Sequence, residues 1–224
     1  MPPFAYLVGL GLGLGLLALV LLNLRAATAR KVARAGYLAR VAPLFDAVHS
    51  RVEPSGFARM SGRWQGQAFD LQVLTDTLTF RKLPSLWLLV TMTEPQTVRG
   101  RLHIMARPGQ NDSFSRFTAM PVSVPLPPGF PQTCALRCDD AALLPPQDLV
   151  AAQAGLFADP LVKELVIAPV GLRLVVLTEE ADRGRYLLFR DAEMGQHPLD
   201  PARLFPILTA LHALCHALKD NDHD

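Results

Sequence analysis

The sequence predicts an α+β protein with a single transmembrane helix at its N-terminus. Two observations predict this class: an uncharged apolar run over residues 4–24, and a change from residue 51 onward to the short patterns of β-strands. The body after the span should be a mostly antiparallel β-sheet with a short middle helix and a C-terminal amphipathic helix. With 224 residues, 50% hydrophobic and 19% charged, the chain can form a packed core of this kind.

The apolar run over residues 4–24 has the length of a membrane span. Its 21 positions hold no charged residue, and as a helix it would measure about 31 Å, the hydrocarbon thickness of a bilayer. Only residues 1–3 precede it and basic residues follow it, so the positive-inside bias predicts an outside N-terminus and a cytoplasmic C-terminal domain at the bacterial inner membrane. A cleaved secretory signal is the alternative, since Ala27-Thr28-Ala29 forms an A-x-A site. The missing basic n-region and the long apolar run favour an uncleaved anchor.

Glycines alternate with leucines inside the predicted span. They form two pairs with a spacing of four residues, Gly9 with Gly13 and Gly11 with Gly15. The two pairs would lie about 200° apart around a helix, so each would form a groove that another helix backbone can approach. Glycine is also generally common in transmembrane helices. We expect the span to pack between helices of integral membrane protein partners.

The formal net charge of +2 divides unevenly along the chain. Residues 1–40 carry +5 because no acidic residue precedes Asp46, and the remainder, with 17 basic and 20 acidic side chains, carries −3. Residues 25–50 should form a basic juxtamembrane helical stalk, since apolar residues keep a helical spacing through Val48. Nucleic-acid binding is not expected, because the body is acidic and holds no nucleic-acid motif. Four side chains of the stalk are expected to contact the headgroups of the lipid bilayer: Arg25, Arg30, Lys31 and Arg34.

The predicted cytoplasmic domain, residues 51–224, divides into parts by composition. Residues 56–140 are β-rich, residues 147–224 mix helix and strand, and the connector 121–146 between them holds seven prolines. Proline at this density is confined to sheet edges or surface loops. The pattern is compatible with one shared sheet or with two subdomains.

Strands are predicted where apolar residues alternate or run together. They cover residues 60–64, 69–73, 86–92, 102–106, 117–124, 134–138, 166–168, 172–177 and 185–189. Gln65-Gly66 should form a tight turn, and residues 148–157 should form the short middle helix. Cys134 and Cys138, at the ends of one strand, would lie about 13 Å apart, which is too far for a disulfide.

The last helix has a favourable start, with Asp200 as N-cap and Pro201 at the first helical position. Its apolar stripe consists of Leu204, Ile207, Leu208, Leu211, Leu214, Cys215 and Leu218. Residues 207–218 hold no charge, and a helix that is apolar nearly all round is buried on more than one side. We therefore expect the opposite face to be covered by the fold or to form a partner interface. That face consists of Ala210, Ala213 and Ala217.

Two histidines four residues apart on this helix, His212 and His216, are the candidate metal ligands. A third ligand would have to come from the fold, with His103 as one candidate, or from the tail 221–224. The pattern is not HExxH, and partly buried histidines satisfied by hydrogen bonds explain it as well. The body contains no nucleophile elbow, P-loop, dinucleotide fingerprint or kinase signature, so no catalytic residue and no cofactor is predicted.

These features favour a non-enzymatic function. The two glycine faces, the uncharged last helix and the lack of a catalytic constellation predict a single-pass accessory, assembly or scaffold subunit of a larger inner-membrane protein complex. The alternative is a membrane-anchored ligand- or metal-binding domain that uses the C-terminal histidine pair. A hydrolase or transferase is least favoured, because no nucleophile has a visible base.

Overall fold

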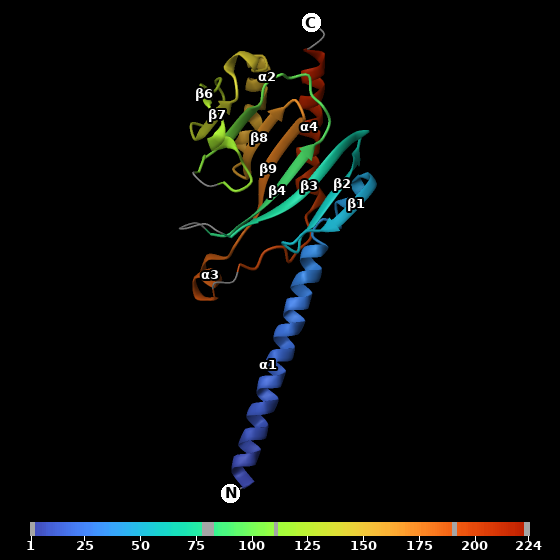
Figure 1. Cartoon of the computed structure of the whole chain (residues 1–224), viewed down its shortest axis with the longest axis vertical. Helices are drawn as coiled ribbons and strands as arrows, with labels where there is room; N and C mark the ends of the chain where they lie inside the picture. The colour runs from blue at the N-terminus through green and yellow to red at the C-terminus, as the bar shows by residue number, and fades with distance from the viewer. Residues whose placement is uncertain (1–2, 78–82, 110–111, 190–191, 222–224) are drawn as a thin grey trace.

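The structure, a computed structural model, describes residues 3–77, 83–109, 112–189 and 192–221. It confirms the α+β class: a long N-terminal helix leads into a body built on one antiparallel sheet, and a C-terminal helix lies along that sheet (Figure 1). The strands are β1 (Asp46–Val52), β2 (Ala58–Trp64), β3 (Gln67–Asp76), β4 (Ser85–Met92), β5 (Leu102–Ala106), β6 (Val122–Val124), β7 (Cys134–Cys138), β8 (Val162–Ala168) and β9 (Gly171–Glu180). The α-helices are α1 (Pro3–Ala35), α2 (Gln147–Ala151), α3 (Arg183–Phe189) and α4 (Pro201–Asp220), and the 3-10 helices are η1 (Ala42–Leu44), η2 (Phe117–Ala119), η3 (Ala141–Leu143) and η4 (Ala152–Ala158).

Helix α1 is continuous from the predicted span into the basic stretch. Its 33 residues measure about 50 Å at 1.5 Å per residue, so roughly 16 Å of helix extends beyond Leu24. Among the described residues, its segment Gly9–Ala35 is the one helix long and apolar enough to cross a membrane, and the body buries none of its apolar window. Figure 1 shows α1 projecting away from the body along most of its length.

The turns that directly follow α1 are built into the core of the body. The chain turns at Gly36, and the apolar side chains of Tyr37, Leu38 and Val41 are buried. The Tyr37 ring meets the Phe57 ring edge-on, with 5.6 Å between centroids. Burial raises the pKa of Tyr37 to about 12, because the phenolate is poorly solvated there. The span is therefore joined to the body by packed residues.

The prediction of a helical stalk through residue 50 was wrong beyond Ala35. The chain forms the short helix η1 and then the strand β1, which pairs antiparallel with β2 at the edge of the sheet. The helical spacing in this stretch depended on Val48, whose side chain is exposed. Pairing with the open edge of β2 satisfies backbone groups that would otherwise lack partners, and this outweighs a weak apolar pattern.

The two halves of the body share one sheet, in the order β1-β2-β3-β4-β9-β8-β5-β7-β6. The hairpin β8–β9 inserts between β4 and β5, so β9 pairs with β4 and β8 pairs with β5. The proline-rich connector supplies β6 and β7 at one edge, where proline is tolerated. The predicted turn of the β2–β3 hairpin is confirmed, since Gln65 and Gly66 have φ of 48° and 80°.

The predicted state of the cysteines is also confirmed. Cys134 and Cys138 stand at the two ends of β7, and both are free. Burial raises the pKa of both thiols.

Helix α4 covers one face of the sheet and begins as predicted. The Asp200 side chain accepts a hydrogen bond from Ala202 N at 3.0 Å, and Pro201 occupies the first turn. All seven residues of the predicted apolar stripe are buried. They join the main core of the body together with residues of β4 and β9, such as Leu88 and Leu174.

Two predicted strands were wrong, one wholly and one in part. Residues 183–189 form the helix α3, because the Asp182 side chain accepts a hydrogen bond from Arg185 N at 2.7 Å and caps the helix. Within 117–124 only β6 is strand. Phe117 N donates to Ser115 Oγ at 3.0 Å and begins the 3-10 helix η2. In both segments a local side-chain acceptor selected a helical turn in a sequence whose apolar content also fits a strand.

Candidate functional site

The face of the sheet opposite α4 carries the candidate site. Strand pairing lines up four residues across it: Thr91 on β4, Arg173 on β9, Val166 on β8 and His103 on β5. Their chain neighbours belong to the main core, so these four side chains point to the other face. The described residues of the segment 107–121 between β5 and β6, namely 107–109 and 112–121, lie across this face and form a small apolar cluster with it. The buried members of this cluster are Leu89, Met105, Phe114, Phe117 and Val175.

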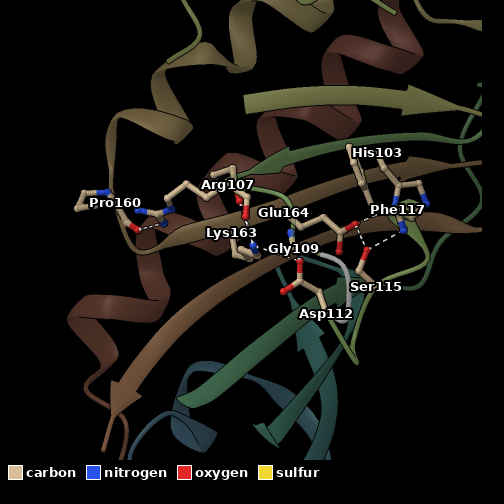
Figure 2. Close-up of polar contacts among 10 residues, drawn as sticks. His103, Arg107, Gly109, Asp112, Ser115, Phe117, Pro160, Lys163 and Glu164 are labelled. Carbon is tan, nitrogen blue, oxygen red and sulfur yellow. Dashed lines mark hydrogen bonds and ion pairs between the residues drawn. The ribbon is translucent and has the colours of Figure 1, made fainter. Parts of the chain in front are cut away.

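A buried carboxylate fastens this segment to β8 (Figure 2). Glu164 Oε1 lies 2.8 Å from His103 Nδ1 and also accepts a hydrogen bond from the Ser115 hydroxyl. Glu164 is 1% exposed and His103 is 5% exposed. Because an ionised carboxylate only accepts hydrogen bonds, Nδ1 of His103 carries its hydrogen toward Glu164.

The second ring nitrogen of His103 is left without a partner. Its Nε2 atom is buried and makes no hydrogen bond within the described part of the chain. A buried polar group in this state costs roughly 1–3 kcal/mol. A molecule bound beside His103 could recover that free energy.

A buried lysine, Lys163, holds the same segment from one residue earlier on β8 (Figure 2). Lys163 Nζ donates to the carbonyls of Ala106 and Arg107 at 3.1 and 2.7 Å and lies 3.2 Å from Asp112 Oδ2. Consecutive strand residues normally point to opposite faces. The pairing of β8 with β9 shifts register between Val162 and Glu164, and such a bulge lets Lys163 and Glu164 both reach the segment 107–121.

The hydrogen bonds do not form a nucleophile with its base. An activated serine has its hydroxyl on the nitrogen of a histidine, which removes the proton. Here the Ser115 hydroxyl donates to Glu164, the same carboxylate that holds His103. The Ser115 hydroxyl is therefore directed to the carboxylate and not to the imidazole.

A pocket of about 360 Å³ opens beside this network. His103, Ser115 and Glu164 line it together with apolar side chains of the sheet and the crossing segment. Three arginines also line it: Arg101, Arg116 and Arg173. Arg173 Nε donates to Thr91 Oγ1 at 3.0 Å. None of the ion pairs among the described residues involves these three arginines.

The four glycines of the predicted span lie on α1 without contacts to the rest of the described chain. A Cβ added at Gly9, Gly11, Gly13 or Gly15 would meet no atom within 4 Å. Both glycine faces are therefore open to another helix, and their packing against a partner stays a prediction.

The basic residues of α1 differ in their surroundings. Arg25 and Lys31 are exposed, while Arg30 and Arg34 are half-buried. The Arg34 guanidinium lies over the Phe57 ring, 5.6 Å from its centroid, so it packs on the body. Lipid contact by these four residues stays a prediction.

The histidine pair of α4 faces outward beside Trp64. The Nε2 atoms of His212 and His216 lie 3.3 Å apart, and the His212 ring meets the Trp64 ring edge-on. Burial lowers the pKa of His212, and the neighbouring His216 and Lys219 lower it further.

No third metal ligand joins this pair in the part of the chain that the structure describes, and the tail residues 222–224 lie outside that part. The other candidate, His103, points to the opposite face of the sheet, so the structure does not bring it to the pair.

The alanine face of α4 is open in this chain. Ala213 is exposed, Ala210 and Ala217 are half-buried, and Phe205 on the same helix is 52% exposed. The fold therefore covers this face only in part, and its use as a partner interface stays a prediction.

Sequence reasoning missed the pocket, because its residues come from β5, β8, β9 and the segment 107–121. One local signal pointed to it. Lys163 and Glu164 stand together inside a strand that is otherwise apolar, where a charged pair needs buried partners.

No protein-family model, curated protein or solved structure matches this chain. The function is therefore argued from the geometry of the chain alone.

Proposed function

We propose that this chain is a single-pass membrane protein and that its cytoplasmic domain serves, without catalysis of its own, as an accessory, assembly or scaffold subunit of a larger inner-membrane protein complex. The observation that carries the proposal is the bare helix α1, with two open glycine faces on an apolar span. Helices in a bilayer associate by close backbone approach at small residues. The occupant we propose is a transmembrane helix of an integral membrane partner.

The junction between α1 and the body supports this function. The buried side chains of Tyr37, Leu38 and Val41 join the helix end to the core. A helix that packs on a partner in the membrane would therefore also fix where the body sits above the bilayer. A scaffold or assembly subunit must hold its cytoplasmic domain at a fixed place on its partner, and a rigid junction provides this.

The charge distribution supports the orientation. Residues 25–40 hold five basic and no acidic side chains directly after the span. Basic residues next to a span favour the cytoplasmic side. An outside N-terminus and a cytoplasmic body follow from this bias.

The test is purification of the tagged full chain from its own membranes in mild detergent, followed by native mass measurement. We expect stoichiometric integral membrane partners with the natural chain. The double substitutions Gly9→Leu/Gly13→Leu or Gly11→Leu/Gly15→Leu should remove them by blocking a groove. Leu10→Ile/Leu14→Ile is the matched control and should retain them.

Two results would contradict the proposal. One is a lone monomer for the natural chain in every mild detergent. The other is an intact mass that begins near residue 30, since this would mean that the apolar segment is a cleaved signal. A topology reporter fused after Asp224 tests the orientation independently and should report the cytoplasmic side.

A further inference from the structure

We propose that the pocket beside His103 binds the phosphate group of a small soluble phosphate monoester. This inference goes beyond the proposed function and does not depend on a membrane partner. It rests on the charge of the pocket, on the unpartnered nitrogen of His103 and on the position of the pocket in the body.

The positive charge of the pocket favours the binding of a dianion. Three guanidinium groups line it, from Arg101, Arg116 and Arg173, and Glu164 is the one carboxylate among its lining residues. Glu164 is already engaged by His103 and Ser115. The lining thus carries a net charge of about +2 with a neutral histidine, and a phosphate monoester carries about −1.5 to −2 at neutral pH. Guanidinium groups also match the oxygen geometry of phosphate.

His103 adds a directed polar contact. Its side chain lines the pocket, is 5% exposed, and has an Nε2 atom without a partner among the described residues. Glu164 fixes the ring through Nδ1. Because Glu164 holds Nδ1, Nε2 is the ring nitrogen left to hydrogen-bond a bound ligand.

The position of the pocket favours a soluble ligand over a lipid headgroup. Strand β9 holds Arg173 of the pocket near its start and Glu179, which interacts with the Tyr37 side chain at the junction with α1, near its end. The six residue-to-residue steps from Arg173 to Glu179 span roughly 20 Å. Helix α1 itself extends roughly 16 Å beyond the predicted span. The pocket is therefore well removed from the bilayer surface.

The walls of the pocket suit a small organic group attached to the phosphate. Phe114 and Val166 provide apolar surface next to the charged groups. The volume of about 360 Å³ is at the small end of ligand pockets, roughly 300–1,000 Å³. A compact monoester fits this space.

The experiment uses the full chain in lipid nanodiscs and two soluble probes, inorganic phosphate and glycerol 3-phosphate, with vesicles containing phosphatidic acid as a third, lipid probe. Binding is measured by calorimetry and by the rise in melting temperature, against chloride of equal ionic strength. The test variant is Arg101→Gln/Arg116→Gln, with Arg116→Gln alone as a milder change at an exposed side chain. The control is Arg183→Gln, an exposed arginine on α3 outside the pocket.

We expect glycerol 3-phosphate to bind the natural chain and Arg183→Gln equally. The double variant should bind at least ten-fold more weakly, and Arg116→Gln should lie between. Equal affinity in the natural chain and the double variant would overturn the proposal, and so would a lack of binding by both soluble probes. Binding that occurs only with vesicles containing phosphatidic acid would overturn the assignment to a soluble ligand. Loss of membrane partners in the glycine variants changes none of these results, so the two proposals fail separately.

Discussion

The two faces of the sheet are closed in different ways. On one face the long helix α4 buries seven apolar residues against the strands. On the other face the segment 107–121 supplies Phe114 and Phe117 and is held by the buried ionisable residues His103, Lys163 and Glu164. Apolar burial stabilises strongly, whereas buried ion pairs roughly balance their own desolvation. The α4 face should therefore carry most of the stability, and the opposite face should be the one suited to binding.

The largest effect is expected on the α4 face. Leu211 is 1% exposed within the stripe, and truncation of a buried leucine typically costs about 2–5 kcal/mol through lost transfer free energy and a cavity. We expect Leu211→Ala to lower the free energy of unfolding of the body by about 3 kcal/mol. Urea unfolding of the full chain in nanodiscs, followed by tryptophan fluorescence, measures it.

Phe205→Ala on the same helix is the control for this measurement. Phe205 is 52% exposed, so its truncation should cost less than about 1 kcal/mol. Equal losses for Leu211→Ala and Phe205→Ala would mean that α4 does not close the main core as described.

A smaller effect is expected on the opposite face. Phe114 is 9% exposed and its ring lies 5.0 Å from the ring of Trp87. Phe114→Ala should lower the free energy of unfolding by about 2 kcal/mol. This is less than is usual for a buried phenylalanine, because the space that the ring leaves adjoins the open pocket. In a Trp64→Phe background Trp87 is the one tryptophan, and its emission should shift to the red as water enters. A loss larger than that of Leu211→Ala would reverse the proposed ranking of the two faces.

The smallest effect concerns the outer side of α4. The pKa of His212 is lowered from its usual 6.5 by burial, by His216 and by Lys219. The folded chain thus binds this proton less readily than the unfolded chain. Neutral His212 therefore contributes to the stability of the fold above pH 6.5, and this contribution is lost as the pH falls through the lowered pKa.

Proton NMR of the His212 ring between pH 8 and 4.5 measures this pKa. His216→Gln should move it part of the way toward 6.5, because burial, the larger cause, remains. Asp200→Asn, at the far end of the helix, is the control and should leave it in place. A pKa at or above 6.5 in the natural chain would show that His212 is more solvated than described.

Local pattern was enough to predict several elements. The span, the strand that ends at Cys134 and Cys138, the turn at Gln65-Gly66 and the stripe of α4 each depend on neighbouring residues. The errors arose where a local pattern was weak. The strand β1 forms at the open edge of β2, and α3 is capped by the side chain of Asp182.

The sequence alone determined the α+β class, the apolar helix and its basic flank, because periodicity, length and charge are properties of adjacent residues. The tertiary structure alone decided that β8 and β9 enter the sheet between β4 and β5. That insertion brings Arg173 and Glu164 into the same pocket as His103, which lies more than 60 residues away along the chain. Contacts between distant segments depend on strand order, which no local pattern encodes. The pocket and its charge follow from that order.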